Sequence, residues 1–177
     1  MGRQSQAIGA AMRREVEQAC KALVLEINRE LRKSGSGTPV DTGHARANWV
    51  PSIGVPFEGE VGARPAGGRD SGGRFAGNSE NAAGVAAVMR FKLGDGVLYL
   101  SNNVPYINRL NYGHSKQAPR LFIEACVDRA LATIQARYDG RVGFDRASVL
   151  GSTAGGQEYL GAESAGNLAD AYSPFGD

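Results

Sequence analysis

Pro39-Val40-Asp41-Thr42-Gly43-His44-Ala45-Arg46-Ala47-Asn48-Trp49 is the stretch at which the pattern of this chain changes. An Asp side chain can accept a hydrogen bond from the backbone two residues on, and Gly adopts positive φ without penalty. The triplet Asp41-Thr42-Gly43 therefore predicts a tight structural turn. A periodic amphipathic segment precedes it, and short apolar runs punctuated by Gly and Pro follow it. We therefore expect a hinge between a long helix and a sheet.

The segment before the turn, residues 5–33, predicts one long helix with a single buried side. Its charged residues fall mainly on the opposite side, as on a solvated helix face. The apolar residues recur at helical spacing and form one continuous stripe: Ile8, Met12, Val16, Ala19, Cys20, Leu23, Ile27 and Leu31.

The segments after the turn read as short strands. Residues 45–53 include Pro51, which is typical of an edge strand or of a strand that ends there, and residues 58–63 offer a second extended piece. Residues 85–93 and 97–102 flank Gly94-Asp95-Gly96, which has the turn chemistry of a β-hairpin. We expect this hairpin at the centre of the sheet.

A second helix is predicted from Pro119, which suits a first helical turn, to Gly140, a natural C-terminal stop. The order of elements predicts an α+β fold, an antiparallel sheet with the N-terminal and C-terminal helices packed on one face. We expect four residues of the first helix, Ile8, Val16, Leu23 and Ile27, to pack against the apolar residues Ile123, Val127, Leu131 and Ile134 of the second. We assign residues 1–140 to this domain.

Two segments are too rich in Gly and small residues to pack alone. Residues 64–84 form a Gly-rich inserted loop of net charge about +1, and residues 141–177 form a C-terminal extension of about −3. Both are expected to be flexible and to be ordered by neighbouring subunits. Large apolar side chains spaced along them are candidate inter-subunit anchors: Phe75, Phe144, Tyr159, Leu160, Tyr172 and Phe175.

The composition narrows the classes of function. With 177 residues, 42% hydrophobic content and a net charge of +2, the chain suits one domain and does not require a polyanionic partner. The residues around His44 and His114 lack the spacing of a zinc site, and Cys20 and Cys126 lie at apolar helical positions, as buried cysteines do. No run approaches the length of a membrane span. We expect no cofactor, no metal, no membrane association and no enzymatic activity.

One tripeptide keeps an enzyme as a remote alternative. Asp41-Thr42-Gly43 resembles the catalytic loop of retroviral-type aspartic proteases, in which two aspartates share a proton. A dimer would supply the second aspartate. In those enzymes the loop lies between buried apolar strands, whereas here it follows a soluble Ser-Gly run and a long helix.

Several motifs together resemble those of a phage protein family. They are Val40-Asp41-Thr42-Gly43 after a long helix, Pro105-Tyr106-Ile107, Tyr112-Gly113, and Ala118-Pro119-Arg120-Leu121-Phe122 opening the last helix. In this combination the chain, over residues 5–138, resembles the tail-completion or neck proteins of long-tailed bacteriophages. It departs from the usual pattern in the order of Ala118-Pro119-Arg120 and in Asn111, where family members often carry an acid.

The resemblance implies a non-enzymatic structural protein of the virion. Such a subunit is assembled in the host cytoplasm and forms a homo-oligomeric ring at the neck, where it completes the tail and allows head–tail joining. Its partners would be other neck and tail proteins, with incidental contact with packaged DNA. The sequence leaves open a tail terminator, a stopper or another minor structural protein of the phage.

Overall fold

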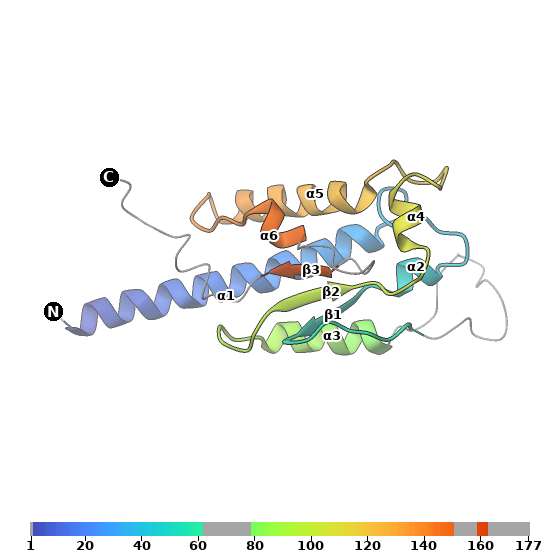
Figure 1. Ribbon diagram of the computed structural model, residues 1–177. Coiled ribbons are helices and arrows are strands. Elements are labelled where there is room, and N and C mark those ends of the chain that lie inside the picture. Colours follow the sequence, from blue (N-terminus) through green and yellow to red (C-terminus); the bar gives the residue numbers. More distant parts are fainter. Residues whose placement is uncertain (1, 62–78, 151–158, 163–177) are drawn as a thin grey trace.

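The computed structural model describes residues 2–61, 79–150 and 159–162. Within them the chain forms α1 (Gly2–Arg32), α2 (His44–Ala47), β1 (Val50–Ile53), α3 (Ser79–Arg90), β2 (Leu98–Ser101), α4 (Ile107–Asn111), α5 (Phe122–Arg137), α6 (Arg146–Leu150) and β3 (Tyr159–Ala162). Figure 1 shows α1 running the length of the molecule, with its first turns projecting beyond the rest of the fold. The predicted α+β class is confirmed.

The described strands form one antiparallel sheet in the order β1-β2-β3. In β1, Pro51 lies opposite Leu100 of β2, which is compatible with a proline because β1 is at the edge of the sheet. On the other side of β2, β3 pairs so that Leu98 faces Ala162 and Ser101 faces Tyr159. The prediction of an edge strand at Pro51 is confirmed.

The N-terminal and C-terminal helices pack on the face of β2 that presents Leu98 and Leu100, as predicted. Leu100 lies in the main core with Leu23 and Ile27 of α1. Residues of α5 complete this core: Phe122, Ile123, Cys126, Val127, Ala130, Leu131 and Ile134.

Part of the predicted α1 stripe lies outside the main core. Ile8 is 61% exposed, because the first turns of α1 extend beyond the sheet. Val16 packs against a second core, formed by Cys20 and Val24 of α1 with α3 and Leu98. The expected contact of Ile8 and Val16 with α5 is therefore wrong. Both cysteines are free and buried, as predicted.

The predicted hairpin of residues 85–93 and 97–102 is wrong. Residues 85–90 belong to helix α3, and β2 pairs with β1 and β3. The segment is alanine-rich, which favours a helix, and its buried Gly84 and Val88 lie one turn apart. Gly84 lets α3 approach β1 closely, since a Cβ there would clash with the Pro51 carbonyl oxygen. Gly94 and Gly96, both with positive φ, instead lie in the connection from α3 to β2.

Three further sequence predictions need correction. Residues 44–47 are helical, so the strand predicted over 45–53 is confined to Val50–Ile53. Residues 58–61 of the predicted second strand are not in a strand. Residues 79–84 of the predicted loop form the start of α3, while residues 64–78 lie outside the described residues, as do residues 62–63 of the predicted second strand.

Part of the C-terminal extension belongs to the fold. Val149 of α6 is buried in the main core, and Phe144 packs against both cores, so Phe144 anchors the extension to its own chain rather than to a neighbour. Tyr159 and Leu160 lie in β3. The other predicted anchors, Phe75, Tyr172 and Phe175, lie outside the described residues.

Candidate functional site: a basic tip beside the Asp-Thr-Gly turn

The predicted turn forms at residues 41–43 and leads into α2. Gly43 has a φ of 83°, the left-handed conformation expected of this glycine, and its carbonyl accepts the Ala47 N–H at 2.9 Å. The Thr42 hydroxyl accepts a hydrogen bond from the His44 N–H, two residues on, at 3.4 Å. Asp41 is exposed, and its predicted bond to the turn backbone stays a prediction.

Buried polar contacts fix this turn to the core. The indole N–H of Trp49, a residue with no exposed surface, donates to the Thr38 hydroxyl at 2.7 Å. That hydroxyl donates in turn to the Leu31 carbonyl at 2.8 Å, near the end of α1. The chain on both sides of the turn is thereby held in place, because buried polar groups rarely give up their partners.

The turn lines a pocket shared with segments far along the sequence. The pocket has a volume of about 360 Å³. The side chain of Gln117 crosses to accept the Val40 N–H at 2.9 Å, and the hydroxyl of Tyr106 lies 3.2 Å from Nδ1 of His44. The other nitrogen of His44 lies 3.1 Å from the Glu60 carboxylate. The lining residues are Pro39, Asp41, Thr42, Gly43, His44, Ala45, Tyr106, Leu110, Ser115 and Gln117.

One carboxylate of this pocket bears on the remote protease alternative. Among the residues that line it, Asp41 is the one carboxylate, so a shared proton would require a second chain to supply the other aspartate. His44 has an exposed side-chain fraction of only 15% and links α2 to Tyr106, which precedes α4, and to Glu60, which fits a clamp between segments. In the described part of the chain, no three His, Cys, Asp or Glu side chains gather as a metal site.

Asn111 organises the segment that follows α4. This fully buried side chain accepts the Ile123 N–H at 3.0 Å, while its amide donates to the Glu124 carboxylate at 3.0 and 3.2 Å. Its main-chain carbonyl also accepts the Leu121 N–H at 2.6 Å. Leu121 has a φ of 61°, a conformation that costs of the order of 1 kcal/mol for a residue with a side chain. The network therefore holds a strained residue at the start of α5.

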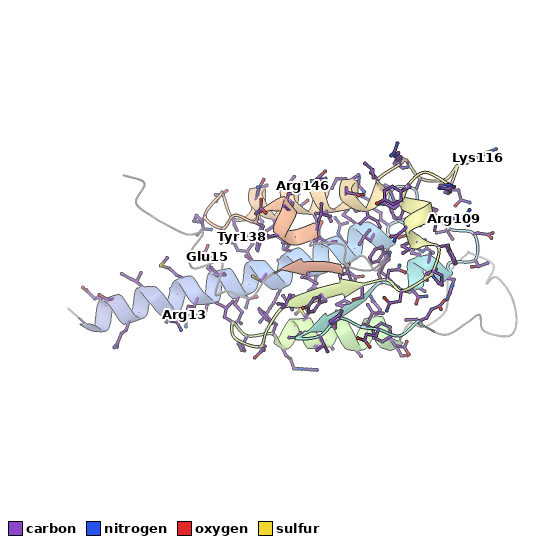
Figure 2. The ribbon with its side chains drawn as sticks, viewed as in Figure 1. Arg13, Glu15, Arg109, Lys116, Tyr138 and Arg146 are labelled. Atoms are coloured by element: carbon purple, nitrogen blue, oxygen red, sulfur yellow. The ribbon has the colours of Figure 1, made fainter. Side chains whose placement is uncertain are left out.

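The strained segment presents a surface that we call the basic tip: Arg109, Tyr112, Lys116, Arg120 and Leu121. All five residues are exposed, with Tyr112 at 52% and Leu121 at 39%. Figure 2 shows Arg109 and Lys116 at one end of the molecule, remote from Arg13 on the projecting half of α1. None of the three cations has an ion-pair partner within the described ranges, and no acidic residue occurs between Asp95 and Glu124. The tip therefore offers positive charge and apolar surface together.

Sequence reasoning missed the basic tip because the net charge of the whole chain is only +2. The acid-free stretch of 28 residues between Asp95 and Glu124 was the available signal. Asn111, noted only for the absence of an acid, is the residue that holds the tip in position.

Comparison of the chain with family models, with curated proteins and with solved structures found no match. None of the helices in the described segments is long and apolar enough to span a membrane.

Proposed function

We propose that this chain is a structural subunit of a tailed-phage virion that assembles as a ring at the head–tail junction. One observation carries the proposal: the motifs on which the family resemblance rests lie at one end of the molecule. The Asp-Thr-Gly turn and Tyr106 of the Pro105-Tyr106-Ile107 motif line one pocket, although more than 60 residues separate them. Gln117, which directly precedes the motif that opens the last helix, lines the same pocket. Motifs that converge in space are better explained by a shared surface than by unrelated turns.

The design of the basic tip supports a docking role. The left-handed Leu121 costs stability, and the buried Asn111 network holds it in place. Strain of this kind is commonly retained where a surface must be held in one shape. A rigid surface loses little conformational entropy on binding, so more of the contact energy appears as affinity. A subunit that joins a large assembly needs such a prepared surface.

The charge of the tip fits an assembly contact rather than catalysis. Exposed cations steer encounter and select partners, and exposed Tyr and Leu side chains contribute the apolar part of a contact. The tip is a single patch at one end of the chain, and in a ring of more than two copies it meets a different patch of the neighbouring copy. A contact between two different patches is head-to-tail and gives a closed ring when the rotation between copies is suitable.

The phage that carries this gene provides the test. We expect deletion of the gene to yield full heads and tails that fail to join, as seen by negative-stain electron microscopy of lysates. Complementation with the wild-type gene should restore joined particles, whereas the double variant Arg109→Glu/Arg120→Glu should not. Arg90→Glu/Arg137→Glu makes the same charge change at exposed sites on α3 and α5 and should complement fully. Normal particles without the gene would overturn the proposal.

A further inference from the structure

The chain leaves the sheet at the end remote from the basic tip. Strand β2 runs from Leu98 to Ser101 and continues toward α4 and the tip. Because β3 is antiparallel to β2, its last residue, Ala162, lies opposite Leu98, the first residue of β2. Residues 163–177 therefore begin at the opposite end of the sheet from α4.

The sequence of residues 163–177, which we call the acidic segment, complements the tip. It contains Glu163, Asp170 and Asp177 and no Lys or Arg, which gives a charge of −3. Leu168, Tyr172 and Phe175 supply large apolar side chains along the same segment, and Pro174 favours an extended chain next to Phe175. The three acids match in number the three cations of the tip, which have no ion-pair partner among the described residues, and the apolar residues match its exposed Tyr and Leu.

From this complementarity we infer that the acidic segment of one copy binds the basic tip of the next copy in the ring. The inference rests on the proposed function and adds the contact that closes the ring. Fifteen residues span up to roughly 50 Å when extended, which is enough to reach across a neighbouring subunit. Since Ala162, which precedes the segment, lies at the end of the sheet remote from the tip, repetition of this contact links copies head to tail.

A phosphodiester backbone would also be attracted by the cations of the tip, and the structure favours the protein segment. DNA phosphates need cations and hydrogen-bond donors, but they leave exposed Tyr112 and Leu121 without an apolar partner. The acidic segment supplies both charge and apolar side chains. Protein interfaces draw their affinity from such buried aromatic and aliphatic anchors.

Disulfide trapping between two singly substituted full-length proteins tests the contact. Copies that carry Phe175→Cys are mixed with copies that carry Tyr112→Cys, so that a cross-link between the engineered residues requires two chains. Burial raises the pKa of the native Cys20 and Cys126 thiols to about 11, which keeps them from competing. We expect a cross-linked dimer at least about tenfold more abundant than with Met89→Cys, an equally exposed control on α3.

Charge reversal on the two sides of the contact provides a second test. Lys116→Glu/Arg120→Glu should reduce the cross-link about tenfold, and Glu163→Lys/Asp170→Lys in the partner should restore it. Equal trapping at Tyr112 and Met89, or no rescue, would overturn the inference. So would a tip that binds duplex DNA in place of the acidic segment, or a Phe175→Cys/Tyr112→Cys chain that closes only within itself. Rings that assemble and join heads after deletion of residues 163–177 would overturn this contact and leave the proposed function standing.

Discussion

Replacing Asn111 with Asp changes one buried amide into a carboxylate of the same size. The oxygen that accepts the Ile123 N–H is retained, but the group that donates to Glu124 becomes a second acceptor about 3 Å from a carboxylate. Loss of a hydrogen bond to a charged group costs about 1.5–3 kcal/mol, and the repulsion between two close carboxylates adds to it. We therefore expect Asn111→Asp to lower the free energy of unfolding by about 2–4 kcal/mol at pH 7.

The pH dependence of this loss separates repulsion from a simple packing defect. When two carboxylates are adjacent, the pKa of one of the two carboxyl groups rises above the value of about 4 that Asp and Glu have in the unfolded chain. The folded variant then binds a proton that the unfolded chain releases, so its stability rises relative to the wild type as the pH falls from 7 toward 4. The difference in unfolding free energy between the variant and the wild type should therefore shrink by at least about half over this pH range.

The free energies of unfolding at pH 7 and pH 4.5 are measured by urea unfolding, followed by the fluorescence of the fully buried Trp49. Gln135→Glu, on the exposed side of α5, introduces the same charge outside the network and should change stability by less than about 0.5 kcal/mol at either pH. An Asn111→Asp deficit that is the same at pH 7 and pH 4.5 would refute the carboxylate argument. A deficit below about 0.5 kcal/mol at pH 7 would refute the role given to the network.

Three further changes test the fold. Leu23→Ala should lower the free energy of unfolding by about 2–5 kcal/mol in thermal or urea unfolding, whereas Ile8→Ala on the projecting half of α1 should lower it by less than about 0.5 kcal/mol. Equal effects would contradict the placement of Leu23 in the core. Gly84→Ala should destabilise the fold by about 1–3 kcal/mol because the new Cβ meets a β1 carbonyl. Gly9→Ala, which has open space around it, should stabilise the fold by up to about 1 kcal/mol. A stabilising effect of Gly84→Ala would be inconsistent with close packing of α3 on β1. Glu17 has a lowered pKa, chiefly because it accepts a hydrogen bond from a lysine one turn along α1. It therefore contributes stability above pH 4.5 that is lost on acidification. Glu17→Gln should flatten the acid side of the curve of unfolding free energy against pH, and an unchanged curve would argue against this contribution.

The parts of the fold that could be predicted are those with local signals. The long apolar stripe predicts α1, and Leu23 and Ile27 meet α5 as expected. Gly43 takes the left-handed conformation that the turn requires. In both places, periodicity or turn chemistry within a few residues determines the structure.

The errors arose where tertiary contacts decide between local alternatives. Residues 85–93 combine β-branched and apolar residues that fit a strand, but residues 85–90 are helical because Gly84 and Val88 pack against β1 and α1. The partners of β2 lie more than 40 residues away along the chain, and β3 pairs through its backbone in a segment with little apolar bulk. Such pairings have no local signature.

The basic tip shows the same limit at the level of the site. Arg109, Lys116 and Arg120 are ordinary surface cations when taken singly. They form one surface because Asn111 fixes the connection between α4 and α5. At that end of the molecule they have no ion-pair partner among the described residues. Buried polar networks of this kind depend on contacts that the order of residues alone does not reveal.

Cryo-electron microscopy of the neck of the virion tests the central claim most directly. The account predicts a closed ring of this chain between the portal-side proteins and the tail tube, with the basic tip of each copy at the interface with the next copy. A particle in which the chain is absent from the neck, or is present there as isolated copies with the basic tip facing solvent, would contradict it.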